Sequence, residues 1–150
     1  MNNFISFMPI ALNEARKAAR RGEVPVGAVI ELNGKIISSA GNNTRKLNDP
    51  TAHAEILAIR EACSILGVER LINANLYVTL EPCPMCAAAI SNARIANLYY
   101  GASDSKSGGV GQGPCIFNHP QSHHKPEVYD GISETECKKL LLDFFKEKRD

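Results

Sequence analysis

Four residues of this chain have the types and the spacing of a metal site that activates water. His53 is followed two positions later by Glu55, and Cys83 and Cys86 lie further along the chain in a Cys-x-x-Cys spacing. Imidazole nitrogen and thiolate sulfur are preferred zinc ligands. Three protein ligands leave the fourth tetrahedral position to water, as catalytic zinc sites do. The sequence therefore predicts one catalytic Zn2+ ion, held by His53, Cys83 and Cys86.

The cysteine pair also has two other interpretations. Cys83 and Cys86 open an alanine-rich segment with helical spacing, so both thiols would lie on one face, where the positive end of the helix dipole favours thiolates. Such a pair can be inert and buried, or it can carry thioredoxin-like redox chemistry. Neither alternative needs His53 or Glu55, so their presence favours zinc.

Glu55 is not needed as a ligand. An acidic side chain in the first turn of a helix is stabilised by the helix dipole alone, and such residues usually face water. Beside a three-ligand zinc ion, a carboxylate can accept the proton of a water molecule whose pKa the metal has brought down to about 7. We therefore expect Glu55 to move protons during catalysis.

The elements that position these residues follow from apolar periodicity. Asp49-Pro50 is expected to open the helix that carries His53 and Glu55, and Pro82 is expected to open the cysteine helix. Asn33-Gly34 suits a type I′ hairpin turn. Helical spacing is found in residues 7–19, 49–66, 83–93 and 133–149, and strand-like runs in 26–32, 35–40, 75–79 and 95–101. This alternation predicts an α/β fold, a three-layer α/β/α sandwich with a mixed sheet, as one domain over residues 1–150.

Composition narrows the class of protein. The chain has 150 residues with 44% hydrophobic content and a formal charge of +1, so it can form one core but has no overall basic character for nucleic acid. No segment approaches the about 18 apolar residues of a membrane span, and the first residues do not resemble a signal peptide. We expect a cytoplasmic protein without membrane contact.

Residues 102–126 form a long segment that is rich in glycine and polar residues. Its run 108–113 resembles a phosphate loop only superficially, because it lacks the strand before it and the helix after it. Its histidines, His119, His123 and His124, suggest either a second metal site or a loop that faces solvent or RNA, and their polar surroundings favour the loop.

Beyond the metal motif, the chain resembles bacterial tRNA-specific adenosine deaminases (TadA type) of the cytidine deaminase-like superfamily, whose zinc signature is H-x-E with P-C-x-x-C. Guanine and cytosine deaminases share the metal motifs, whereas the later motifs favour tRNA. The matching motifs are Glu23 to Ala28, Asn42, Asp49 to Glu55, Glu81 to Cys86, Gly101-Ala102 with Asp104 and Lys106, Asn118-His119-Pro120, and Asp143-Phe144-Phe145.

The resemblance implies a five-stranded mixed sheet and one zinc ion per subunit of a homodimer. It also implies hydrolytic deamination of adenosine to inosine at the wobble position of a tRNA anticodon loop, with an arginine tRNA as the expected substrate and ammonia as the second product. A deaminase of a free base or nucleotide and a non-enzymatic zinc-binding module remain alternatives. Glu55 argues against the latter, because a structural site needs no proton shuttle.

The resemblance also implies roles for single residues. Glu55 would pass protons from the water to the adenine ring and then to the departing amine, which the Pro82 carbonyl would hold. The Ala54 amide would contact the base, and Asn42 would contact the nucleoside. Further RNA contacts are implied for Asp104, Lys106, Asn118, His119, Phe144, Lys148 and Arg149. Some of these also have structural interpretations: Asp104 as a turn cap, Phe144 as core, and the basic residues as complements of the helix dipole.

Overall fold

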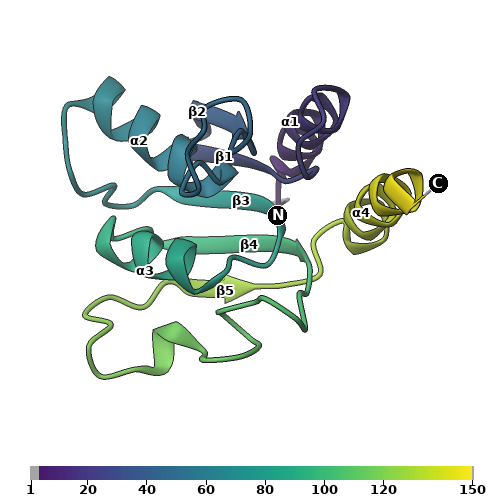
Figure 1. Cartoon of the computed structure of the whole chain (residues 1–150). Helices are drawn as coiled ribbons and strands as arrows, with labels where there is room; N and C mark the ends of the chain where they lie inside the picture. The colour runs from purple at the N-terminus through teal and green to yellow at the C-terminus, as the bar shows by residue number, and fades with distance from the viewer. Residues whose placement is uncertain (1–3, 150) are drawn as a thin grey trace.

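The protein, described here by a computed structural model over residues 4–149, contains one five-stranded sheet with helices on both faces (Figure 1). The strand order is β2-β1-β3-β4-β5. β1 is antiparallel to both β2 and β3, while β3, β4 and β5 run parallel. The elements are α1 (Met8–Arg20), β1 (Gly27–Leu32), β2 (Lys35–Gly41), α2 (Ala54–Leu66), β3 (Asn75–Leu80), α3 (Pro84–Asn92), β4 (Asn97–Ala102), the short 3-10 helix η1 (Ile116–Asn118), β5 (Glu127–Tyr129) and α4 (Glu134–Arg149).

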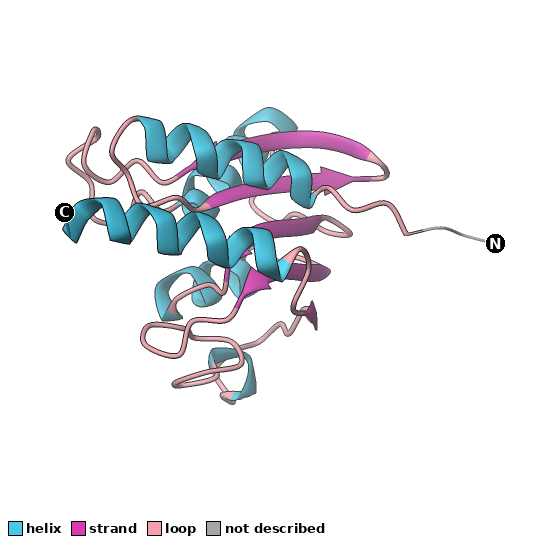
Figure 2. Cartoon of the chain, turned by 90° about the vertical axis from the view of Figure 1, so that its right-hand side faces the viewer, coloured by secondary structure: helices cyan, strands magenta, loops and turns pink. Residues whose placement is uncertain are grey.

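The helices form two layers around this sheet. Figure 2 shows α1 and α4 side by side in front of one face, while α2 and α3 lie on the other. Each face has its own apolar core: Met8 and Cys137 pack on the α1 and α4 side, whereas Ile90 and Leu98 belong to the larger core under α2 and α3. Burying each large aliphatic side chain contributes about 1.5–3 kcal/mol. The predicted three-layer α/β/α sandwich with a five-stranded mixed sheet is confirmed.

The central strands are apolar on both faces because both faces are covered. Ala28, Val29 and Ile30 are consecutive residues of β1 and all are fully buried, the pattern expected where helices pack on each side. The hairpin between β1 and β2 turns at Asn33 and Gly34, whose φ angles are 54° and 81°. Two positive φ angles define the predicted type I′ turn.

The starts of the two site helices differ from the prediction. α2 begins at Ala54, after His53 as N-cap with φ −71° and ψ 153°, and not at Asp49-Pro50. The Asp49 carboxylate instead accepts hydrogen bonds from the amide and hydroxyl of Thr51, at 2.9 and 2.7 Å, and so closes a separate turn. α3 likewise begins two residues after Pro82, with Cys83 as its N-cap.

Across residues 4–149, none of the helices is both long and apolar enough to cross a bilayer.

Candidate metal centre

The three predicted ligands meet where two helices begin. His53 is the N-cap of α2, Cys83 is the N-cap of α3, and Cys86 lies in the first turn of α3. Each helix N-terminus carries about half a positive charge, because its first N–H groups have no partner within the helix. Two such ends converge here, which stabilises thiolates and a nearby carboxylate.

The ligand atoms have the spacing of a tetrahedral zinc site. His53 Nδ1 lies 3.7 Å from Cys83 Sγ and 3.5 Å from Cys86 Sγ, and the three ligand atoms lie within 4.8 Å of one another. Zinc bound to one nitrogen and one sulfur in tetrahedral geometry holds those atoms about 3.6 Å apart. The residues therefore fit one zinc ion per chain.

In the metal-free protein these ligands share protons. Hydrogen bonds from Cys86 and His53 lower the pKa of the Cys83 thiol to about 4. The bond to Cys83, together with burial, raises the pKa of Cys86. The bond to Cys83 also raises the pKa of His53. Cys83 is thus a thiolate that accepts hydrogen bonds from Cys86 and His53. Zinc binds thiolate and neutral imidazole, so it has to displace the protons of these two donors.

Zinc binding is therefore expected to release about one or two protons per ion near pH 7. His53 and Cys86 hold their protons to higher pH than usual, because their pKa values are raised. These protons compete with zinc for the ligand atoms. Zinc affinity is therefore expected to rise as the pH rises and the protons are lost. Calorimetric titration of the metal-free protein in two buffers with different ionisation enthalpies measures the number released. Equal heats in both buffers would contradict the proton-sharing arrangement.

Glu55 lies beside the ligands without belonging to their set. Its side chain sits in the first turn of α2 and is only 4% exposed. Burial raises the pKa of its carboxyl group, which makes Glu55 a stronger proton acceptor than an exposed glutamate. This position suits the predicted proton shuttle.

A pocket of about 230 Å³ opens onto these residues. Its lining is partly apolar and includes Glu55 and two of the three predicted ligands, His53 and Cys83. The lining residues are Val24, Val26, Asn42, His53, Glu55, Leu80, Glu81, Cys83, Asp104 and Ser107. A wider groove of about 560 Å³ shares Val24, Leu80, Asp104 and Ser107 with the pocket. The site therefore combines a small pocket with a larger adjoining groove.

Three predicted substrate contacts already take part in hydrogen bonds of the protein. The Ala54 amide donates to Asn42 Oδ1 at 3.0 Å, and the Pro82 carbonyl accepts from the Gly109 amide at 2.8 Å. A carbonyl oxygen has a second lone pair, so Pro82 can still accept from a substrate amine. The Ala54 amide has one hydrogen, so a base that bonds to it must share or replace Asn42.

The structure places Asp104 in the pocket wall and Lys106 in the groove. Asp104 Oδ1 also accepts from the amides of Lys106 and Ser107, at 3.1 and 2.9 Å. Asp104 therefore caps a turn, which is one of the two roles that the sequence suggested for it. This turn places Lys106 and Ser107 at the groove.

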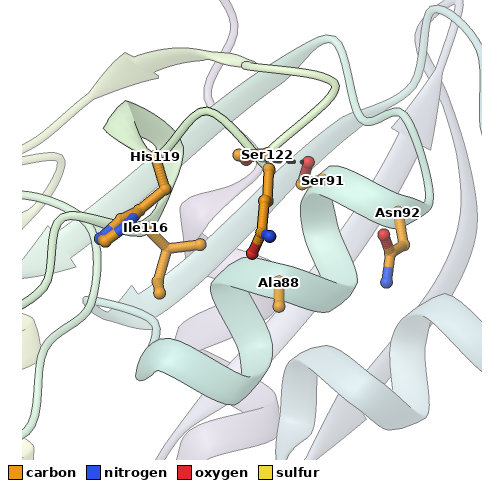
Figure 3. Close-up of a pocket in the computed structure, with 7 residues that line it drawn as sticks. Ala88, Ser91, Asn92, Ile116, His119 and Ser122 are labelled. Atoms are coloured by element: carbon orange, nitrogen blue, oxygen red, sulfur yellow. Dashed lines mark hydrogen bonds between the residues drawn. The ribbon is translucent and has the colours of Figure 1, made fainter.

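Asn118 and His119 lie elsewhere. His119 lines a separate pocket of about 250 Å³ against α3 (Figure 3), and its Nε2 lies 2.8 Å from the Pro114 carbonyl oxygen. Asn118 Oδ1 accepts from Lys125 Nζ at 3.1 Å. The structure does not bring these two residues into the pocket of Glu55. The residues around His119 there are Ala88, Ser91, Asn92, Ile116, Gln121 and Ser122.

The helix α4 contributes Phe145 to the groove, a residue that the sequence did not single out as a substrate contact. Phe145 lines the groove and is 45% exposed, whereas the predicted contact Phe144 is half-buried and has Lys148 Nζ 5.4 Å from its ring centroid. The two rings are neighbours in one apolar stripe, so the sequence pattern alone did not separate them. The side chain of Arg149 is outside what the structure describes.

Comparison with known proteins assigns the family. Residues 1–102 match the model of the cytidine and deoxycytidylate deaminase zinc-binding region. A tRNA-specific adenosine deaminase of Agrobacterium fabrum is 59% identical over 143 residues, covering 95% of this chain and 94% of that protein. A solved structure from a study of A-to-I editing by tRNA:A34 deaminases at the wobble position of transfer RNA has a TM-score of 0.89 at 59% identity, covering 90% of this chain and 98% of that one.

A guanine deaminase from Bacillus subtilis is more distant. Its X-ray structure has a TM-score of 0.67 at 34% identity, covering 99% of this chain and 94% of that one. Both relatives share the fold, but the resemblance to the tRNA-specific enzymes is much greater in sequence and in structure. The chain therefore belongs to the cytidine deaminase-like zinc enzymes and, within them, to the family of tRNA-specific adenosine deaminases.

Proposed function

We propose that this protein is a zinc-dependent hydrolase that converts adenosine to inosine at the wobble position of a tRNA anticodon and releases ammonia. The observation that carries the proposal is the buried Glu55 carboxylate beside a three-ligand zinc set, in the lining of a pocket that shares residues with a larger groove. The greater similarity to tRNA-specific relatives supports tRNA over a free base as the substrate.

The reaction needs a nucleophile and two proton transfers. Zinc in the His53, Cys83 and Cys86 site would supply the Lewis acidity that makes water a nucleophile near neutral pH. Glu55 accepts a proton from the attacking water and donates it to the adenine ring nitrogen, while the water oxygen bonds to C6. Glu55 then transfers the second proton of that water to the exocyclic amine, the C6–N bond breaks, and ammonia leaves. The remaining lone pair of the Pro82 carbonyl orients the departing amine.

The shape of the site suits a base taken out of its stack. The narrow pocket accepts the base alone, and the groove takes the neighbouring nucleotides, as deaminases that act on a flipped base require. Unpaired bases in loops, such as those of an anticodon loop, are the usual targets of sequence-specific RNA recognition. We assign Asn42 and Ala54 to the nucleoside. The remaining proposed RNA contacts are Asp104, Lys106, Asn118, His119, Phe144, Phe145, Lys148 and Arg149.

We further infer a single deaminase domain that acts in the cytoplasm as a homodimer. Three apolar side chains near the end of α2 support an interface there, because they are strongly exposed: Ile65 at 59%, Val68 at 45% and Ile72 at 57%. Exposed apolar patches are typical of association sites.

One assay tests the proposed function. The zinc-loaded protein is incubated with an arginine tRNA that carries adenosine at the wobble position and, in parallel, with free guanine, cytosine and adenosine. Inosine and ammonia are measured. Inosine in the tRNA is the expected result, and the same tRNA with guanosine at the wobble position is the control. Ammonia from a free base, with the tRNA unchanged, would overturn the proposal in favour of a free-base deaminase.

Lys106→Ala is expected to raise the KM for tRNA, because Lys106 is an exposed cation in the groove. Loss of one phosphate contact also lowers the slope of log affinity against log salt by about one. Steady-state kinetics at several salt concentrations measure both effects. The matched control is Lys35→Ala, an exposed lysine after the hairpin turn at the opposite end of β1 from the pocket. Equal effects of both substitutions would show that Lys106 acts only through net charge.

A further inference from the structure

A second buried carboxylate, Glu81, is bonded to the loop that borders the pocket. Glu81 lies between β3 and the first cysteine ligand and is 2% exposed. Its Oε1 accepts from the Asp104 amide at 3.0 Å. Its Oε2 accepts from three consecutive amides, those of Val110, Gly111 and Gln112, at 3.2, 3.0 and 3.1 Å. One side chain thus holds both ends of the segment 104–112.

The arrangement explains the glycine-rich run 108–113. Successive backbone amides that converge on one point form an anion-binding nest. Here the anion is the carboxylate of Glu81, a residue of the protein itself. The run 108–113 resembles a phosphate loop in sequence, but its amides at residues 110–112 already donate to Glu81.

The segment 104–112 also lies directly on the metal-ligand segment. The Gly109 amide donates to the Pro82 carbonyl at 2.8 Å. A Cβ atom at Gly108 would lie 2.6 Å from Glu81 Oε2, and one at Gly109 would lie 2.6 Å from the Pro84 nitrogen. Only glycine allows so close an approach, to the Glu81 side chain at Gly108 and to the Pro84 backbone at Gly109.

The same segment supplies the substrate side of the site. Asp104 and Ser107 line the pocket, and Lys106 lines the groove. Glu81 is bonded to Asp104 at the start of this stretch and to residues 110–112 beyond its end, and it is separated from Cys83 by Pro82 alone. The Glu81 carboxylate therefore sets the position of the segment 104–112 relative to the metal ligands.

We propose that Glu81 is a positioning residue for tRNA: it holds the loop 104–112 in the shape that receives the nucleotides beside the target base, without itself reacting. The inference rests on the proposed function and adds a determinant of substrate affinity to it. Since both carboxylate oxygens are bonded to loop amides, the role of Glu81 is expressed through Asp104, Lys106 and Ser107. Loss of Glu81 should therefore raise KM more than it lowers kcat.

Glutamine is the informative substitution, because it keeps the shape of glutamate but replaces one acceptor oxygen with a donor NH2 group. Whichever way the amide turns, that group faces a backbone N–H of Asp104 or of residues 110–112. Glu31→Gln is the matched control. Glu31 is also buried, at 7% exposure, and accepts from the Gly34 amide and from Asn75 Nδ2, both at 2.7 Å, at the opposite end of β1 and β3 from the pocket.

The experiment compares the zinc-loaded wild type, Glu81→Gln and Glu31→Gln by steady-state kinetics on the wobble-adenosine tRNA, zinc content and amide hydrogen exchange. For Glu81→Gln we expect a KM about ten-fold higher, a kcat within about three-fold of wild type and full zinc content. The amides of residues 104 and 110–112 should exchange at least about ten-fold faster. Glu31→Gln should change neither the KM nor the exchange of this loop.

A wild-type KM together with unchanged loop exchange in Glu81→Gln would overturn the inference. Loss of zinc from this variant would also overturn it, because the effect would then lie on the metal ligands.

Gly108→Ala replaces Glu81→Gln if that variant does not fold. It displaces the loop from an intact Glu81 and should raise the KM in the same way. An unchanged KM in Gly108→Ala would overturn the inference. If the wild type itself leaves the tRNA unmodified, the proposed function fails. Normal wild-type turnover with an unaltered Glu81→Gln KM rejects only the role of Glu81.

Discussion

Glu55→Ala is expected to lower kcat by about 10³-fold or more while the protein keeps its zinc ion. A positioned general acid or base contributes about 10²–10⁴-fold, and Glu55 would serve at successive proton transfers of one turnover. His53, Cys83 and Cys86, the groups with ligand spacing, are untouched by the substitution. Single-turnover inosine formation and zinc analysis of the same preparation measure the two quantities.

The control for this prediction is Glu61→Ala. Glu61 lies on the same helix as Glu55 but is exposed, so its removal should leave both turnover and zinc content unchanged. If zinc were lost from Glu55→Ala together with activity, the carboxylate would be supporting the metal site and the proton-shuttle role would have to be abandoned.

Cys86→Ala is expected to abolish both zinc binding and deamination. Cys86 is fully buried, and its sulfur lies 3.5 Å from the ligand nitrogen of His53. Its loss leaves two of the three ligands. Because a metal that binds only the folded state stabilises it, the thermal midpoint of Cys86→Ala should also fall to that of the chelator-treated wild type.

Cys63→Ala is the matched control, since Cys63 lies on α2, outside the ligand set. It should keep one zinc ion per chain and its activity. Elemental analysis and thermal unfolding, each with and without chelator, separate the variants. A Cys86→Ala protein that still bound one zinc ion tightly would refute the assignment of Cys86 as a ligand.

The loop-bound glutamate shows where sequence reasoning stops. In the sequence, Glu81 is an acidic residue before Pro82 and Cys83 that matches a family motif. Nothing local indicates that its oxygens accept from amides 23 to 31 positions later in the chain. Long-range hydrogen bonds of this kind depend on which loops the fold brings together, so the periodicity of the chain does not contain them.

β5 shows a similar limit. It has three exposed residues and lacks the apolar alternation that identifies a strand. Its pairing with β4, in which Val128 faces Leu98 and Tyr129 faces Tyr99, defines it instead. The residues alone indicated four strands, and the expectation of a fifth came from the family resemblance.

Helix starts were predicted to within a few residues. Asp49-Pro50 has the residue types of a helix start, but the Asp49 carboxylate bonds to Thr51 and closes its own turn, so α2 begins only at Ala54. Competing local hydrogen bonds of Asp side chains cause this ambiguity. The shift matters for the site, because it makes His53 the N-cap, where its ring can turn toward the cysteines.

The sequence by itself determined the fold class and the chemistry of the metal centre, because ligand types, their spacing and helical or strand periodicity are local properties of a chain. Only the tertiary structure decided how that centre is approached. It placed Lys106 and Phe145 at the groove, His119 against α3, and Glu81 beneath the loop 104–112. These placements depend on packing between segments far apart in the chain, where burial and unpaired backbone donors select the partner.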